Sequence, residues 1–125
     1  MNQLVFIFIG GGIGSLCRYL MSIAVYSFLG RNFPYGTLSV NVLGCFLMGL
    51  LSVLLLERLN AHADLFRALL LIGFLGGFTT FSSFSLETLN LLENSEILKA
   101  FLNMFLSLGF CMIAVIIGAV LGRQL

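Results

Sequence analysis

The sequence predicts an all-α integral membrane protein with four transmembrane helices, and two observations carry this prediction. The chain has 125 residues, of which 60% are hydrophobic and 9% are charged, whereas soluble domains carry about 25% charged residues. The charges leave uncharged stretches at residues 32–56, 68–86 and 100–122, and a bilayer core needs roughly 20 apolar residues per helix. A chain this short cannot bury so much apolar surface in water, so an ordinary soluble domain is excluded.

Four spans are predicted within a single transmembrane domain, residues 1–125, and they lie at about 4–29, 37–56, 66–93 and 97–122. The runs are continuously apolar and do not alternate, which favours helices over barrel strands. Breakers lie where the connections are needed. Residues 30–36 contain the only proline, a polar loop contains the only histidine, His62, and residues 93–96 form a tight turn.

The charges are nearly balanced, with six basic and five acidic residues, which argues against a nucleic-acid-binding protein. Four spans put Arg58, Arg67 and Arg123 on one side of the membrane and Arg31 and Lys99 on the other. Membrane proteins normally carry excess Lys and Arg on the cytoplasmic side. The weak bias predicts dual topology, in which chains insert both ways and pair as an antiparallel homodimer. Chance variation in so few charges is the open alternative.

Small residues recur at the spacing of tight helix packing. Gly10 and Gly14 form a GxxxG pair, as do Gly73 with Gly77 and Gly118 with Gly122. In lipid, such residues let helix backbones approach closely. They predict a tight bundle and no particular chemistry.

The third span is predicted to break near its middle, at residues 76–80. Residues 73–85 read GFLGGFTTFSSFS, and two adjacent glycines followed by two threonines are poor helix formers. Non-helical backbone at membrane depth requires protein or a polar cavity around it. Freed carbonyls there suit a cation, and the start of the second half-helix suits an anion. The alternative is a kinked helix whose hydroxyls bond back to the preceding turn.

Phe81 and Phe84 are three residues apart and share one helix face, among the hydroxyls of Thr80 and Ser83. Aromatic ring edges carry partial positive charge. Ring edges and hydroxyl donors together suit a small anion that has shed its water, which Lys or Arg would hold too tightly for release.

Other polar residues within the spans leave alternatives open. The Asn41 amide can donate to an anion or bond across helices. Asn103, Ser107 and Cys111 follow one another at intervals of four, so they form one stripe that lines a path or packs against Asn41.

Arg18 and Glu87 are predicted to be structural anchors. The three cysteines, which fall in three different spans without metal-type spacing, are interpreted as small buried thiols. A single histidine, no close pair of acids within the spans and no nucleophile motif argue against an enzyme.

These motifs resemble those of the Fluc (CrcB) family of fluoride ion channels. Residues 73–85 resemble the family's central signature, and residues 10–19 and 34–49 resemble its first- and second-helix motifs. The resemblance implies a passive, fluoride-selective channel that exports fluoride from the bacterial cytoplasm across the inner membrane and lowers its toxicity. It also implies an antiparallel, dual-topology homodimer with two fluoride pathways.

The resemblance assigns the residues as well. The fluoride pathway would hold six residues: Phe81, Phe84, Asn41, Thr80, Ser83 and Ser107. A structural sodium ion at the dimer centre would be held by the backbone carbonyls of Gly76 and Thr79 from both chains. Arg18 and Glu87 match the family's first-helix arginine and the acid after the phenylalanine signature.

The alternative function is a proton-coupled exporter like the small multidrug resistance proteins. Those proteins share the small size and the four spans. They need an acid in the first helix, and residues 4–29 contain none.

Overall fold

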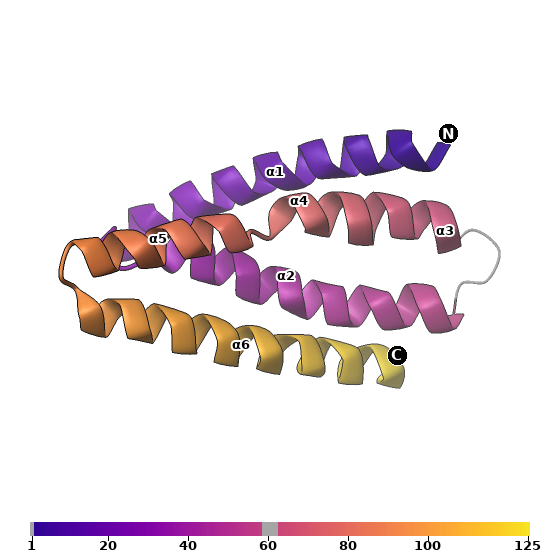
Figure 1. Ribbon diagram of the computed structural model, residues 1–125. Coiled ribbons are helices and arrows are strands. Elements are labelled where there is room, and N and C mark those ends of the chain that lie inside the picture. The colour runs from indigo at the N-terminus through magenta and orange to yellow at the C-terminus, as the bar shows by residue number, and fades with distance from the viewer. Residues whose placement is uncertain (1, 59–62) are drawn as a thin grey trace.

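The computed structural model describes residues 2–58 and 63–125, so His62 and the loop around it lie outside the described residues. The elements are α1 (Asn2–Leu29), α2 (Tyr35–Val53), the π-helical turn η1 (Leu54–Arg58), α3 (Ala63–Phe66), the π-helical stretch η2 (Arg67–Leu75), α4 (Gly76–Phe78), α5 (Phe81–Glu93) and α6 (Ile97–Gln124). Both ends of the chain lie at the same end of the bundle (Figure 1).

Four helical runs in the described residues are long and apolar enough to cross a membrane: Asn2–Leu29, Tyr35–Glu57, Ala63–Glu93 and Ile97–Gln124. The predicted number of apolar helices, four, is therefore confirmed. Each run is longer than predicted because helical hydrogen bonding continues into the polar flanks, where composition alone marks no boundary.

The two short connections depend on left-handed backbone. Gly30 ends the first helix with a φ of 81°, a conformation that glycine adopts without a Cβ clash. Ser95 has a φ of 60° in the turn before α6. There the Glu96 amide donates to the Leu91 carbonyl at 2.8 Å, which closes the end of α5. The tight turn predicted at residues 93–96 is confirmed.

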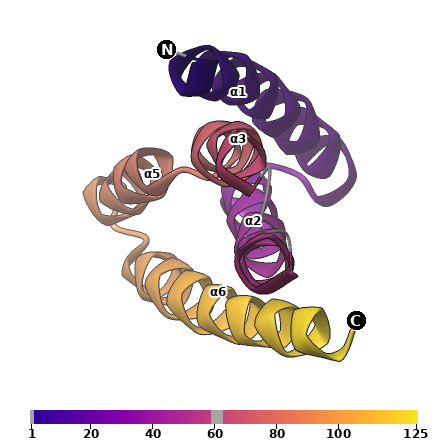
Figure 2. The same cartoon turned by 90° about the vertical axis from the view of Figure 1, so that its right-hand side faces the viewer.

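The helices follow one another across the bundle in the order α1, third span, α2, α6 (Figure 2). α1 packs against η2 and α4 through glycines. A Cβ on Gly14 would collide with the Phe74 carbonyl oxygen, and one on Gly77 with the Gly11 carbonyl oxygen. Only residues without side chains allow this approach, so the predicted packing role of these glycines is confirmed.

α2 and α6 run in the same direction and use glycines in the same way. A Cβ on Gly49 would meet the Val115 carbonyl oxygen, and one on Gly118 the Phe46 carbonyl oxygen. Each helix therefore presents a glycine to the backbone of the other, which holds the pair in one register.

The largest fully buried side chains are Leu75, Val40 and Asn103. The buried core of the described chain is therefore small, and it includes one polar side chain. Large apolar side chains cover the outside; Phe28 is 89% exposed and Phe8 is 82% exposed. Exposed apolar surface on this scale is incompatible with water and suits contact with lipid.

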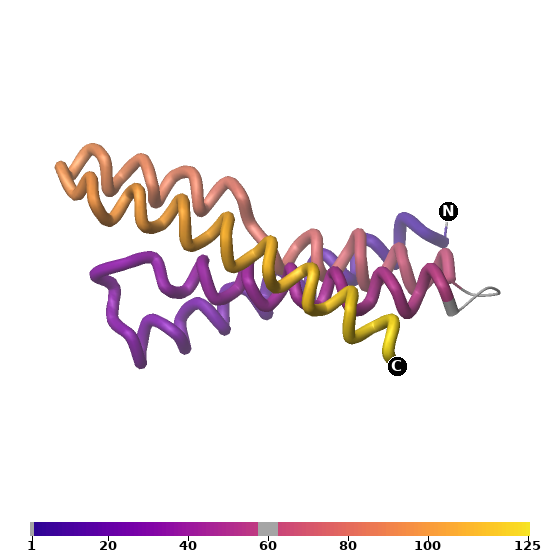
Figure 3. Tube along the Cα trace, turned by 90° about the horizontal axis from the view of Figure 1, so that it is seen from below, coloured from indigo at the N-terminus to yellow at the C-terminus, as the bar shows by residue number. Residues whose placement is uncertain are grey.

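The bundle opens at the end away from the chain termini. There α5 and the first half of α6 diverge from the hairpin of α1 and α2 (Figure 3). The divergence starts where α4 gives way to α5, at the segment that the sequence singled out.

Candidate functional site

Two residues with extended backbone separate α4 from α5. Thr79 has φ −80° and ψ 156°, and Thr80 has φ −150° and ψ 114°. The Thr80 Oγ1 accepts a hydrogen bond from the Ser83 amide at 3.1 Å, which is the geometry of an N-cap. The threonine thus starts the new helix after the interruption.

Asn41 of α2 braces this segment from the side. Its Nδ2 donates to the Thr80 carbonyl at 2.9 Å, and its Oδ1 accepts from the Thr80 amide at 2.8 Å. One side-chain amide therefore satisfies both backbone groups of Thr80. Of the two roles considered for Asn41, the structure shows the bond across helices, and the second hydrogen on Nδ2 remains for another acceptor.

Two backbone carbonyls lose their helical donors at the interruption. In a continuous helix the Gly76 carbonyl would accept from the Thr80 amide, and the Thr79 carbonyl from the Ser83 amide. Here the first amide donates to Asn41 and the second to the Thr80 hydroxyl. Carbonyl oxygens are the kind of ligand that hard cations prefer, so the Gly76 and Thr79 carbonyls are candidate ligands for a cation.

Hydroxyls also bond back to preceding turns, as the alternative interpretation expected. Thr79 Oγ1 donates to the Leu75 carbonyl at 2.9 Å, and Ser85 Oγ donates to the Phe81 carbonyl at 2.9 Å. These hydroxyl bonds to preceding carbonyls therefore occur together with the helix interruption, and the third span is not a continuous kinked helix.

A cavity of about 550 Å³ lies beside the interruption. It is lined by Asn41, Gly44, Cys45, Met48, Thr79, Thr80, Phe81, Phe84, Met104, Ser107, Leu108 and Cys111. None of these lining residues is charged. Five of the six residues predicted for an anion pathway share this wall, from α2, α5, α6 and the interruption itself.

The two phenylalanines form a pair at the start of α5. Their ring centroids are 5.4 Å apart and the ring planes meet at 48°. The Phe81 side chain is 78% exposed in the single chain, so a partner, a lipid or an ion is free to contact it.

Ser83 is the predicted pathway residue that is not among the cavity's lining residues. It joins the site through Thr80, whose Oγ1 donates to Ser83 Oγ at 3.1 Å. The hydrogen of the Ser83 hydroxyl is then available to a further acceptor.

The polar stripe on α6 divides between two roles. Asn103 is 1% exposed, and its Nδ2 donates to Thr88 Oγ1 on α5 at 2.9 Å. Ser107 Oγ donates to Asn103 Oδ1 at 3.4 Å, while Ser107 and Cys111 line the cavity. Sequence reasoning missed Thr88; its position one turn after Phe84 on the same helix face was the available signal.

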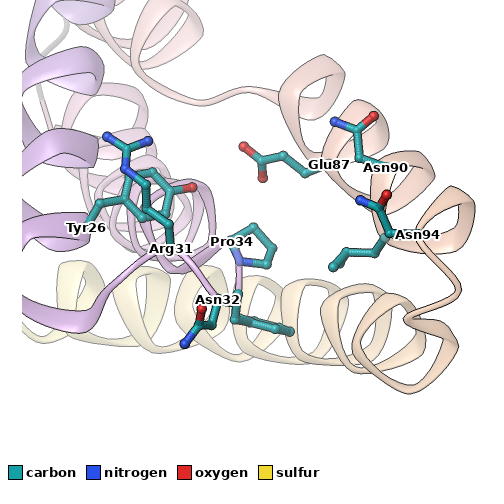
Figure 4. Close-up of a pocket in the computed structure, with 9 residues that line it drawn as sticks. Tyr26, Arg31, Asn32, Pro34, Glu87, Asn90 and Asn94 are labelled. Carbon is teal, nitrogen blue, oxygen red and sulfur yellow. The ribbon is translucent and has the colours of Figure 1, made fainter.

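A second cavity, of about 290 Å³, opens where the two helix pairs diverge; its lining includes Tyr26, Arg31 and Glu87. The Glu87 carboxylate points away from α5 into this space (Figure 4). It accepts a hydrogen bond from Thr37 Oγ1 at 2.7 Å. The Arg31 guanidinium lies 4.9 Å from the centre of the Tyr26 ring.

Arg18 lies on α1 and is half-buried. The ion pairs that the structure gives for the described residues are Arg67–Asp64 and Lys99–Glu96, so Arg18 is in neither. Its role as an anchor stays a prediction.

The comparison with known families decides the relationship. The family model described as CrcB-like protein, Camphor Resistance (CrcB) matches residues 5–119. The chain belongs to the CrcB family. The resemblance read from residues 10–19, 34–49 and 73–85 is therefore confirmed.

Relatives of this family member are named fluoride-specific ion channel FluC. The protein of Coxiella burnetii (strain Dugway 5J108-111) is 50% identical over 125 residues, with both chains covered in full. That of Geobacter sulfurreducens is 45% identical over 125 residues, again with full coverage. That of Methylococcus capsulatus is 52% identical over 126 residues, and the chain spans 55% of its length.

These relatives are named as ion channels, which agrees with the expectation that the chain is not an enzyme. Their names give no support to the alternative function, a multidrug exporter. Family membership and four apolar helices make the CrcB-family chain a multi-pass protein of a bacterial inner membrane.

Proposed function

We propose that the chain is a passive, fluoride-selective ion channel that exports cytoplasmic fluoride and so lowers its toxicity. The observation that carries this proposal is the uncharged cavity beside the interruption of the third span. Its wall combines an aromatic pair, a hydroxyl cluster and one side-chain amide. The names of the full-length relatives support fluoride as the ion.

The donors of this wall, together with the neighbouring Ser83, suit a small anion without its hydration shell. Asn41 keeps one amide hydrogen beyond its bond to Thr80, and Ser83 keeps its hydroxyl hydrogen. The edges of the Phe81 and Phe84 rings add partial positive charge. No lysine or arginine is among the described residues that line the cavity, so an ion that binds there is also able to leave.

A passive pore is sufficient for export. Hydrogen fluoride crosses a bilayer as a neutral molecule and ionises in the less acidic cytoplasm. The negative membrane potential then drives the trapped anion outward through an open pathway. The mechanism requires no energy source.

We further propose that two chains pair antiparallel, with the interruptions of their third spans at the centre of a dual-topology homodimer. The nearly even charge distribution supports insertion in both directions. Arg18 and Glu87 would anchor the frame, and the bond between Glu87 and Thr37 supports that role.

The Gly76 and Thr79 carbonyls would hold a structural sodium ion between the two chains. The redirected amides of Thr80 and Ser83 support this assignment, because they leave both carbonyls without helical donors. When bound, the ion would supply positive charge that holds the two interruptions together. Asn41 would support this site by holding the Thr80 backbone through two hydrogen bonds.

Anion efflux from liposomes that contain only this protein tests the channel. We expect fluoride efflux under a potassium-set membrane potential, with no chloride efflux under the same conditions. Absence of fluoride flux from vesicles with confirmed protein incorporation would contradict the proposal.

The dual topology has a separate test. The variant has all three native cysteines replaced and carries Asn94→Cys in the turn before α6. A membrane-impermeant maleimide is added outside intact cells. We expect about half of the chains to be labelled, because insertion in both directions places this turn outside in only half of them. Labelling of all chains or of none would exclude dual topology without bearing on the flux result.

A further inference from the structure

Four of the residues that line the uncharged cavity contain sulfur. Cys45 and Met48 come from α2, and Met104 and Cys111 come from α6. Each cysteine lies one turn after a polar residue of the same wall, Cys45 after Asn41 and Cys111 after Ser107. The third cysteine, Cys17, lies on α1 and is not among the residues that line this cavity.

Cys45 and Cys111 lie at the same level of two helices that are in contact. Gly49 of α2 lies against the Val115 carbonyl of α6, and Gly118 of α6 lies against the Phe46 carbonyl of α2. Because the two helices run in the same direction, the residues one turn before Gly49 and Val115, which are Cys45 and Cys111, also lie at one level. Both line the same cavity, so an ion in that cavity has access to both cysteines.

The chemistry of this donor set is selective. Thiolate and thioether sulfur prefer soft ions such as Cu(I), whereas carboxylate, carbonyl and water oxygens suit magnesium, calcium and manganese. None of the described residues in the wall carries a carboxylate or an imidazole, so the sulfurs compete there only with neutral amide and hydroxyl oxygens.

We propose that Cys45 and Cys111 form a binding site for a soft monovalent cation, Ag⁺ or Cu⁺, flanked by the thioethers of Met48 and Met104. The metal joins the two cysteine sulfurs in a linear S–metal–S unit. Each thiol loses its proton to solvent, so Ag⁺ and two thiols give one anionic bis-thiolate complex and two protons, with no change in oxidation state.

A second part of the proposal rests on the proposed channel function. The metal occupies the wall that carries Asn41, Phe81 and Ser107, and its complex has a net negative charge. It therefore blocks the cavity and repels fluoride, so that soft metal ions inhibit export.

Binding is tested first, without reference to transport. Purified unmutated protein in a chloride-free nitrate buffer is titrated with silver nitrate and then treated with N-ethylmaleimide, and the labelled peptides are quantified by mass spectrometry. We expect silver to protect Cys45 and Cys111 together while Cys17 still reacts. Equal protection of all three cysteines, or of none, would overturn the site.

Variants test how many silver ions each chain binds and which residues bind them. A Cys17→Ala protein should retain about one silver ion per chain after desalting, as a two-thiol site predicts, and Cys45→Ala or Cys111→Ala in that background should lose it. Met104→Leu should weaken retention, and Met112→Leu, outside the cavity, should not. Retention of silver by both cysteine double variants, checked for unchanged size in detergent, would overturn the assignment.

Fluoride efflux from liposomes tests the block. Silver should stop efflux through the Cys17→Ala protein and spare both double variants; because silver fluoride is soluble, precipitation does not interfere. Block of all variants alike, or of none despite bound silver, would overturn the inhibitory role. Absence of flux before silver is added would contradict the channel proposal instead, and the protection pattern would still decide the metal site.

Discussion

The two halves of the third span contact their neighbours by different means. The first half, from α3 to α4, meets α1 through backbone, where Gly14 lies against the Phe74 carbonyl and Gly77 against Gly11. The second half, α5, meets α2 and α6 through polar side chains, in the pairs Glu87–Thr37 and Thr88–Asn103.

This difference separates two tasks. Backbone contact through glycine leaves no polar side chain for an ion and fixes the frame by shape alone. The half with side-chain hydrogen bonds begins at the cavity and carries donors to it. We therefore expect substitutions where the first half contacts α1 to affect the free energy of unfolding most, and those at the start of α5 to affect transport most.

Gly14→Val should have the largest effect on stability. A Cβ there overlaps the Phe74 carbonyl oxygen, so α1 must move away, at a cost of about 3 kcal/mol. Reversible unfolding in mixed detergent–SDS micelles measures this free energy. Gly12→Val is the matched control, because nothing lies within 4 Å of a Cβ at Gly12. Equal effects of the two substitutions would contradict the packing argument.

Asn41→Leu should come next and should affect both tasks. It leaves the amide and carbonyl of Thr80 without their partner, which costs about 2 kcal/mol for buried groups. We expect fluoride efflux to fall together with the unfolding free energy. Asn90→Leu on the exposed side of α5 is the control and should change neither. A variant at Asn41 with normal stability and normal efflux would show that the brace is dispensable.

The bond between Thr88 and Asn103 should contribute less. A double-mutant cycle with Thr88→Val and Asn103→Leu should give a coupling of about 0.6 kcal/mol, the average for such bonds in a membrane protein. Ser85→Ala combined with Asn103→Leu should show no coupling, since the Ser85 hydroxyl bonds within its own helix. Similar coupling in both cycles would mean that the measurement reports general loosening of α5.

Phe81→Ile should change the unfolding free energy by no more than about 0.5 kcal/mol, as for other exposed positions, because the ring is 78% exposed. Fluoride efflux should nevertheless fall, since the aromatic edge is lost; Phe84→Ile should reduce it in the same way. Phe105→Ile, at an α6 position that is 70% exposed and outside the cavity, should keep normal efflux. Unimpaired efflux in both Phe81→Ile and Phe84→Ile would remove the aromatic mechanism.

Much of the site was predictable because its residues are close in sequence. Thr80, Phe81, Ser83 and Phe84 occupy one turn, so helix geometry alone places them together. The partners were not predictable in the same way. Whether Asn41 bonds to Thr80 or to the α6 stripe, and whether Asn103 reaches Thr88, depends on the relative positions of helices that are far apart along the chain.

Composition and local order alone determined the membrane class, the four apolar helices, the tight turn at residues 93–96 and the weak point near residues 76–80, because hydropathy and backbone propensity act over short segments. Tertiary structure alone decided which polar groups meet. It assigned Asn41 to the Thr80 backbone, which takes the helical donor away from the Gly76 carbonyl, and it brought Cys45 and Cys111 to one cavity wall. The glycine contacts between α2 and α6 set the register of those two helices, and a register between distant segments is not encoded in either segment by itself.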